Sequence, residues 1–395
     1  MQEVYIVAAK RTAVTKAKVG RLATVRPDDL IATLITSLVK NTKIDPKLIN
    51  DVIIGCATPE AEQGLNIARI SLLLAGLPYS VPGLTLNRFC ASGLESIATA
   101  AAKIQAGHAE AILAGGVESM SLLPFGGHNI SANPKLFDAR YNLSSVAYSM
   151  GLTAEKVATK YNISREEQDK FALNSHHKAI VAQETGIFTP EICEVISTLK
   201  TATGNIAAVK SDEIIINSDS GPRPDSSLEA LAKLKPVFKK DGSVTAGNSS
   251  QVSDGAGLVM LVSENFATKH NLSPLARFCS YHVAGLEPEY MGMGPVHAIP
   301  GALAKAKLKI EDIAHIELNE AFASQALAVI NELDLDVSVI NPYGGAIALG
   351  HPLGATGAIK TATCIHSLKR KKQRYGMVTM CIGTGMGAAG IFENI

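Results

Sequence analysis

The chain has 395 residues, of which 47% are hydrophobic and 18% are charged, and its formal net charge is +1. This composition is typical of a folded globular protein and excludes a disordered chain. The balanced charge gives no reason to expect nucleic-acid binding. No run of about 18 apolar residues occurs, so we expect no membrane span, and residues 1–7 do not resemble a signal peptide. We therefore expect a cytoplasmic protein.

Six cysteines are scattered along the chain without a Cys-x-x-Cys pair. This spacing argues against a disulfide framework and a zinc ribbon, and it fits a reducing compartment. His176 and His177 lie on a polar helix face without a second ligand pair, so we expect no metal site. We predict that four of the cysteines are ordinary packed side chains: Cys56, Cys193, Cys279 and Cys364.

Short apolar runs alternate with amphipathic segments in the first part of the chain. Residues 4–9, 51–56 and 110–114 read as buried strands, whereas residues 28–39 and 66–75 read as helices. The length suggests two or three domains. This alternation predicts an α/β layered fold with a largely parallel sheet.

Cys90 lies where a strand is predicted to turn into a helix. Residues 81–86 are β-prone, and apolar residues recur at helical spacing from Ser92 to Ile104. The free N–H groups of a first helical turn favour an anion, which predicts that the Cys90 thiol shifts toward the nucleophilic thiolate. A buried cysteine that packs as a small hydrophobe fits this stretch equally well.

Three pairs of similar stretches occur in the same order and at nearly constant separation, which indicates an internal duplication. The pairs are residues 43–54 with 309–318, residues 90–93 with 354–357, and residues 112–116 with 378–383. We predict a first half at residues 1–121, with about 252–272, and a second half at residues 273–395. The loop-rich segment 122–251 between them, with a polar helix at 164–184, reads as an inserted domain that binds substrate.

Two further stretches carry reactive groups. Residues 341–357 place five glycines around His351, and residues 381–387 place Cys381 directly after the strand predicted at 376–380. If the two halves pair, the turns at Cys90 and His351 converge on one cleft. We expect the imidazole to take the Cys90 proton and Cys381 to move a proton at another atom.

Four ordered motifs resemble the thiolase family, and more closely its degradative 3-ketoacyl-CoA thiolases. They are residues 87–94 (Asn-Arg-Phe-Cys-Ala-Ser-Gly-Leu), 319–323 (Asn-Glu-Ala-Phe-Ala), 344–354 and 381–385. The resemblance implies two duplicated α/β halves in a five-layer α-β-α-β-α fold, with an inserted loop domain. Condensing enzymes of fatty-acid synthesis share this fold, but they resemble a Cys-His-His pattern where this chain has Cys381.

The resemblance also implies a role for each catalytic residue. Cys90 would attack the 3-keto carbon and carry the acyl group, and His351 would accept its proton. His351 and a water held by Asn319 would form one oxyanion hole. The backbone N–H groups of Cys90 and Gly383 would form a second one. Cys381 would protonate the departing enolate and then deprotonate CoA.

Coenzyme A would serve as co-substrate, with no permanently bound cofactor. The family pattern places one residue near its adenine-phosphate end, three along the pantetheine and two near the thioester: Arg223; Phe238, Ala246 and Ser250; Met150 and Phe322. A solvated turn arginine explains Arg223 equally well. Many thiolases resemble Tyr-His-Met-Gly where residues 148–151 read Tyr-Ser-Met-Gly, which leaves the acyl preference open.

The implied reaction is cleavage of 3-ketoacyl-CoA by CoA to acetyl-CoA and an acyl-CoA two carbons shorter, as in fatty-acid β-oxidation. The alternatives are a short-chain acetoacetyl-CoA thiolase running toward condensation and a non-catalytic acyl-CoA binding protein. The family implies a homodimer or a dimer of dimers. A partner enzyme that carries the preceding oxidation steps is a further expectation.

Overall fold

The computed structural model describes residues 2–202 and 209–395. Its main sheet has ten strands in the order β10-β11-β12-β9-β1-β8-β5-β3-β4, with β2 paired to β8. These strands are β1 (Val4–Arg11), β2 (Thr15–Lys16), β3 (Asp51–Gly55), β4 (Gly83–Leu86), β5 (Ala111–Ser119), β8 (Ser253–Ser263), β9 (Ala276–Gly285), β10 (Ile313–Leu318), β11 (Tyr375–Ile382) and β12 (Met386–Asn394). A separate hairpin pairs β6 (Val195–Ala202) with β7 (Val209–Ile216).

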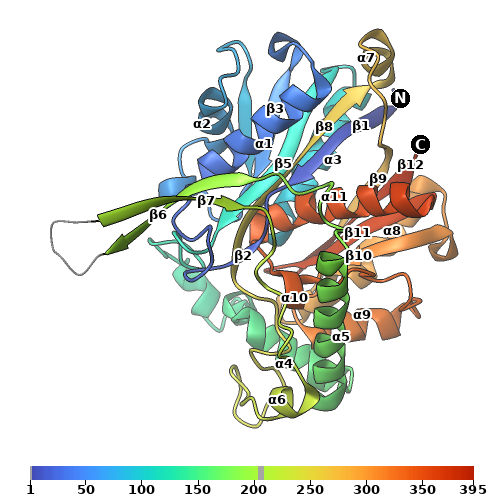
Figure 1. Ribbon diagram of the computed structural model, residues 1–395. Helices are drawn as coiled ribbons and strands as arrows, with labels where there is room; N and C mark the ends of the chain where they lie inside the picture. Colours follow the sequence, from blue (N-terminus) through green and yellow to red (C-terminus); the bar gives the residue numbers. More distant parts are fainter. Residues whose placement is uncertain (1, 203–208) are drawn as a thin grey trace.

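The helices follow the order of the chain and are shown in Figure 1. They are α1 (Pro27–Thr42), α2 (Ile67–Leu74), α3 (Ser92–Gln105), α4 (Met150–Lys160), α5 (Arg165–Glu184), α6 (Leu228–Ala232), α7 (Glu264–Lys269), α8 (Gly294–Ala306), α9 (Ala323–Glu332), α10 (Ala346–Leu349) and α11 (Leu353–Lys371). The strands and helices expected in the first half are therefore confirmed, with shifts of a few residues at their ends.

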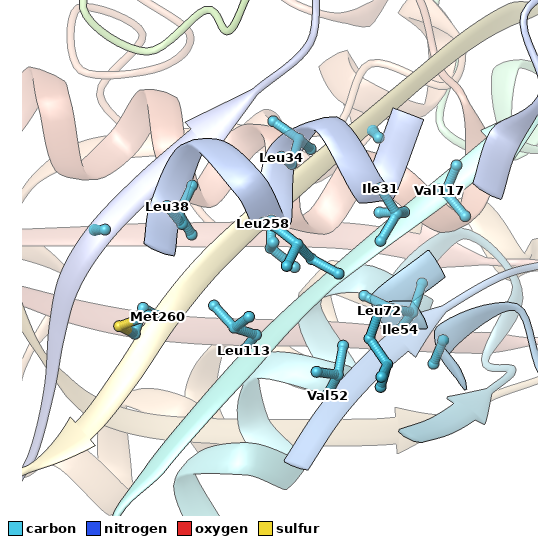
Figure 2. Close-up of a cluster of buried hydrophobic side chains, with 14 of the residues drawn as sticks. Ile31, Leu34, Leu38, Val52, Ile54, Leu72, Leu113, Val117, Leu258 and Met260 are labelled. Atoms are coloured by element: carbon cyan, nitrogen blue, oxygen red, sulfur yellow. The ribbon is translucent and has the colours of Figure 1, made fainter. Parts of the chain in front are cut away.

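Helices α1 and α2 cover the outer face of the first half of the sheet. Strand side chains alternate between the two faces of a sheet, so every second residue of β3, β5 and β8 points toward α1 or α2. Figure 2 shows the resulting apolar layer. Its members include Ile31, Leu34, Leu38, Val52, Ile54, Leu72, Leu113, Val117, Leu258 and Met260. Full burial of each such side chain contributes about 1.5–3 kcal/mol.

Helices α3 and α11 form the middle layer of the molecule. The intervening strand residues Ile53 and Ile112 face them from the first half, and Val378 and Met380 face them from the second half. The two helices approach closely, because a Cβ atom added to Gly357 of α11 would lie 2.4 Å from the backbone nitrogen of Leu94 in α3.

Helices α8 and α9 cover the outer face of the second half. They pack on strand residues that point away from α11, such as Met377 and Ile391. The layers therefore run α1/α2, sheet, α3/α11, sheet, α8/α9, and the expected five-layer fold is confirmed. The two sheet regions join through β1 and β9, which pair only at Tyr5–Arg277 and Ile6–Ala276.

The order of elements repeats between the halves. The first half runs β1-α1-β3-α2-β4-α3-β5-β8, and the second runs β9-α8-β10-α9-α11-β11-β12. An isolated bridge between Ile316 and Ile340 takes the place of the β3–β4 pairing. Corresponding strands also occupy corresponding places in the sheet. The repeat places the turn before α3 and the turn before α11 in equivalent positions.

The expectation of a largely parallel sheet is wrong. Strands β3, β4 and β5 pair in parallel, as do β10 and β11, but β8 runs antiparallel to β1 and β5, and β12 runs antiparallel to β9 and β11. A parallel neighbour requires a long crossover, usually a helix. The tight turn between β11 and β12 provides none, so the last strand of that half returns antiparallel.

Within the middle segment, α4, α5 and α6 lie together at one end of the molecule, whereas the β6–β7 hairpin extends from its side (Figure 1). Ser164 caps α5 in a reciprocal pair with Glu167, which confirms the helix expected at 164–184. Over residues 2–202 and 209–395, the structure contains no helix that is both long and apolar enough to span a membrane.

Candidate active site

Cys90 lies in a single 3-10 turn, η3 (Phe89–Ala91), between the end of β4 and the start of α3. Phe89 has a φ of 44°, which is a strained conformation for a bulky residue. Asn87 Oδ1 accepts the Phe89 N–H at 2.7 Å and helps to hold this turn. Backbone strain is concentrated at functional sites, so the turn favours a reactive Cys90 over a merely packed one.

The Cys90 thiol is buried, and burial raises its pKa to about 11. The backbone N–H groups of Gly383 and of Cys90 itself face the sulfur and partly oppose this increase. The prediction that the helix start shifts this thiol toward thiolate is therefore wrong, because desolvation outweighs the backbone donors. A neutral thiol at this position needs a base.

His351 lies between α10 and α11 and is buried. Its Nδ1 is 2.6 Å from Thr356 Oγ1, and its Nε2 is 3.4 Å from Asn319 Nδ2. Burial, together with the positive charge of Lys360, lowers its pKa to about 3. The imidazole is therefore uncharged at neutral pH, which is the form that can accept a proton.

Asn319 follows β10 directly, and its N–H donates to Thr379 O at 2.9 Å. Its Oδ1 is buried without a hydrogen-bond partner among the described residues. Cys381 lies in β11 just before the turn that contains Gly383. Burial raises the pKa of Cys381, with a further contribution from nearby Cys90. The structure thus connects all five expected catalytic residues in one region.

Apolar side chains surround Cys381. They include Phe322 just before the start of α9, Met150 at the start of α4, and Phe238 from the middle segment. The rings of Phe238 and Phe322 meet edge to face, with centroids 6.1 Å apart. Ser250 adjoins this group, because its N–H donates to Ala321 O at 3.0 Å. Four of the six residues expected to contact CoA therefore lie around the second thiol.

The other two expected CoA contacts are exposed. Arg223 forms an ion pair with Asp225 at 3.4 Å, and its backbone N–H donates to His176 Nδ1 at 3.2 Å. Ala246 lies on the surface of the same segment. No described contact joins Arg223 to the group around Cys381, so its role stays a prediction.

Glu118, at the end of β5, is a buried residue of the site that sequence reasoning did not single out. Its carboxylate accepts hydrogen bonds from the N–H groups of Ala57 and Gly354 and from Gln63 Nε2, at 2.8–2.9 Å. Burial nevertheless raises its pKa. Because Gly354 lies in the first turn of α11, which follows His351, Glu118 connects the two halves. The sequence feature that could have pointed to Glu118 is an acidic residue at the end of an otherwise apolar strand.

No sequence feature pointed to Thr356 as a partner of His351, because this contact depends on how the first turn of α11 is oriented. Within the part of the chain that the structure describes, no cluster of three His, Cys, Asp or Glu side chains is arranged to hold a metal ion. The reactive groups of the site are therefore two thiols, one imidazole, one carboxamide and the backbone donors.

Comparisons with known proteins agree with this geometry. Residues 4–265 match the family model "Thiolase, N-terminal domain", and residues 272–394 match "Thiolase, C-terminal domain". The chain is 51% identical to a 3-ketoacyl-CoA thiolase of Bacillus subtilis, covering 100% of both chains. It is 43% identical to the peroxisomal 3-ketoacyl-CoA thiolase of Homo sapiens, covering 99% of this chain and 91% of that protein.

Two solved structures are also similar to this chain along its whole length. The Bacillus anthracis acetyl-CoA acetyltransferase superimposes with a TM-score of 0.89 at 39% identity, and human mitochondrial 3-ketoacyl-CoA thiolase with a TM-score of 0.89 at 41% identity. Each comparison covers 100% of this chain and 99% of the other. With both family models, the full-length relatives and the five connected candidate residues in agreement, the chain belongs to the thiolase family of acyltransferases.

Proposed function

We propose that this protein catalyses CoA-dependent thiolytic cleavage of 3-ketoacyl-CoA, yielding acetyl-CoA and an acyl-CoA two carbons shorter. One observation carries the proposal: the Cys90 thiol of the first half adjoins the Gly383 N–H and Cys381 of the second half. Full-length relatives named 3-ketoacyl-CoA thiolase support the same substrate class.

The first half-reaction breaks the C2–C3 bond of the substrate. His351 Nε2 takes the Cys90 proton, which requires the tautomer whose Nδ1–H donates to Thr356 Oγ1. Cys90 Sγ then bonds to C3, and the C2–C3 electron pair leaves as the enolate of acetyl-CoA. Asn319 Oδ1, which has no hydrogen-bond partner among the described residues, is suited to accept a hydrogen from a water that donates to the enolate oxygen, beside His351. Cys381 delivers a proton to C2.

The second half-reaction releases the acyl group. Cys381, now a thiolate, takes the proton of incoming CoA, and the CoA sulfur bonds to the thioester carbon on Cys90. The backbone N–H groups of Cys90 and Gly383 stabilise the oxyanion of this step. Cys90 leaves as a thiolate and recovers its proton from His351, so the protein returns to its starting state.

The middle segment contributes the CoA site in this proposal. Residues 122–251 form the loop domain between the halves at 1–121, with 252–272, and at 273–395. Phe238, Ala246 and Ser250 lie along the pantetheine, Met150 and Phe322 lie near the thioester end beside Cys381, and Arg223 lies near the adenine-phosphate end. CoA acts as co-substrate, and no permanently bound cofactor takes part. We further propose a cytoplasmic homodimer or dimer of dimers.

A second candidate is acetoacetyl-CoA thiolase activity in the condensing direction, favoured by the close structural match to an acetyl-CoA acetyltransferase. A non-catalytic acyl-CoA binding protein is disfavoured, because binding alone requires neither buried thiol. To separate the three, the protein is mixed with CoA and 3-ketoacyl-CoA of four to sixteen carbons, and loss of the ketoacyl enolate absorbance is followed. Turnover confined to four carbons favours the second candidate, and no turnover at any length refutes both enzyme proposals.

The choice of nucleophile is tested separately. Cys90→Ala should bind CoA normally but form no acyl-enzyme, whereas the wild type should gain the mass of the acyl group. Intact-mass spectrometry after mixing with acyl-CoA reads this directly. An acylated Cys90→Ala protein would mean that another side chain carries the acyl group.

A further inference from the structure

Glu320 is a buried carboxylate immediately after Asn319, and none of the catalytic steps above uses it. Its Oε1 accepts a hydrogen bond from Asn341 Nδ2 at 2.8 Å, and its Oε2 accepts one from Ser175 Oγ at 2.7 Å. The Ile347 N–H also points to Oε2, at 3.3 Å. The Glu320 carboxylate therefore connects the segment that follows β10 to the glycine-rich loop before His351 and to helix α5 of the middle segment.

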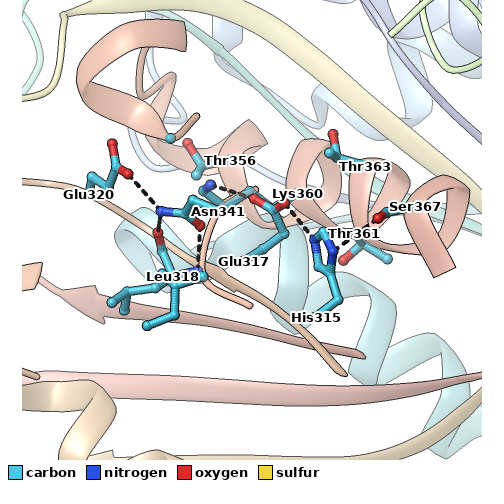
Figure 3. Close-up of polar contacts among 12 residues, drawn as sticks. His315, Glu317, Leu318, Glu320, Asn341, Thr356, Lys360, Thr361, Thr363 and Ser367 are labelled. Atoms are coloured by element: carbon cyan, nitrogen blue, oxygen red, sulfur yellow. Dashed lines mark hydrogen bonds and ion pairs between the residues drawn. The ribbon is translucent and has the colours of Figure 1, made fainter. Parts of the chain in front are cut away.

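Asn341 fixes Leu318, the residue that precedes Asn319. Its Oδ1 accepts the Leu318 N–H at 3.0 Å, and its Nδ2 donates to Leu318 O at 2.8 Å as well as to Glu320. Figure 3 shows the Asn341 side chain bonded to both Leu318 and Glu320. The residues before and after Asn319 are thus fixed by the same amide group.

The fit around the carboxylate is close. A Cβ atom added to Gly345 would lie 2.1 Å from Glu320 Cδ, so the loop backbone packs directly on the carboxylate. Ser175 Oγ, which donates to Glu320, also accepts the Gly345 N–H at 3.0 Å. His351 has separate anchors, because its N–H donates to Gln251 O at 3.1 Å and its Nδ1 meets Thr356. A change at Glu320 therefore acts on Asn319 more directly than on His351.

We propose that Glu320, clamped by Asn341 and Ser175, is a positioning residue that sets the place of Asn319 and so controls the carbon–carbon cleavage step. This rests on the proposed function. Asn319 acts on the enolate oxygen through the water that it holds, whereas the oxyanion of acyl transfer between Cys90 and CoA is stabilised by the backbone N–H groups of Cys90 and Gly383. Displacing Asn319 should slow cleavage and spare acyl transfer.

The test compares two reactions in Glu320→Gln. Cleavage is followed with a 3-ketoacyl-CoA, and acyl transfer by exchange of isotopically labelled CoA into acetyl-CoA, which needs no C–C bond change. The variant retains the side-chain size but replaces an acceptor oxygen with a donor. We expect the ratio of cleavage to exchange to fall about tenfold or more, since small displacements of a catalytic group can cost about a hundredfold. Exposed Glu332→Gln, the matched control, should leave both rates unchanged.

Ser175→Ala is a second, milder variant, and it tests the positioning role of Glu320 if Glu320→Gln does not fold. It removes one donor to the carboxylate, and the ratio should fall about threefold. An unchanged ratio in the folded variants, whether both reactions persist or both fall together, overturns the proposal. Wild-type protein that cleaves no 3-ketoacyl-CoA refutes the proposed function itself, which is a different result.

Discussion

Removing the positive charge of Lys360 should destabilise the protein through its buried partner Glu317. Lys360 Nζ lies 2.9 Å from Glu317 Oε2, and His315 Nε2 lies 2.8 Å from Oε1, as Figure 3 shows. Burial opposes ionisation of Glu317, but Lys360 and His315 overcome it and lower its pKa from 4.5 to about 2. In Lys360→Met, we expect the remaining partners of the Glu317 carboxylate to be too weak to offset the free-energy cost of burying its charge.

The magnitude follows from the pKa. A decrease from 4.5 to about 2 corresponds to about 3 kcal/mol of unfolding free energy at neutral pH, and breaking a buried pair costs about 3–5 kcal/mol. For 395 residues, unfolding entropy of about 2 cal/mol/K per residue converts this loss to a decrease of about 4 °C in Tm.

The dependence on pH has a definite sign. In the wild type the Glu317 pKa is lowered, so its stabilisation is complete above about pH 4.5 and is lost as the pH falls toward 2. In Lys360→Met, burial should raise the Glu317 pKa, so the variant loses stability as the pH rises. The deficit in Tm should therefore be larger at pH 8 than at pH 5.

Differential scanning calorimetry of four proteins tests this reasoning. Glu317→Gln/Lys360→Met removes both charges and should recover part of the lost Tm. The matched control is Lys369→Met, at an exposed position of the same helix, and it should change stability by no more than about 0.5 kcal/mol. A Tm for Lys360→Met within about 1 °C of the wild type would refute the argument, as would a double variant less stable than the single one.

Other expectations concern the reacting groups and the packing between halves. Alkylation of Cys90 by iodoacetamide should accelerate as the pH rises and reach no plateau below about pH 10, because burial raises its pKa to about 11; a plateau near pH 7 would contradict this. Cys381→Ala should form the acyl-enzyme but lower kcat about 10²–10⁴-fold, measured by intact mass and steady-state turnover; full turnover would exclude Cys381 as the acid. Gly357→Ala should destabilise the protein by about 1–3 kcal/mol, because its Cβ would lie 2.4 Å from Leu94 N; an unchanged unfolding midpoint in urea would show that α3 and α11 can separate.

Much of the fold could be predicted because the apolar patterns of individual strands and helices agree with the structure that they adopt. The strand containing Val52 and the helix containing Leu34 have plain apolar periods, and the repeated stretches around Cys90 and Gly354 exposed the duplication. The direction of β8 could not be predicted, because its partners β1 and β5 are distant in the sequence. The apolar pattern specifies burial and leaves the direction of pairing open.

The site was predictable where a motif surrounds the reactive residue, as at Cys90 and His351. The pKa of Cys90 could not be predicted. The sequence indicates that a helix begins there, but it does not show how deeply the thiol is buried. Glu118 and Asn341 act through backbone groups far away in the chain, Gly354 and Leu318 respectively. Such partners leave no spacing pattern in the sequence, so only coordinates identify them.

The backbone contact between α3 and α11 has a consequence for how this protein can diversify. Since no side chain separates Leu94 from Gly357, the turns that precede these helices cannot move apart to suit a longer or bulkier acyl group. Adaptation to new substrates should therefore accumulate in residues 122–251, as insertions and exchanged side chains. An engineer who wants a different acyl length should randomise that segment around Met150 and Phe238 and leave the central helices untouched.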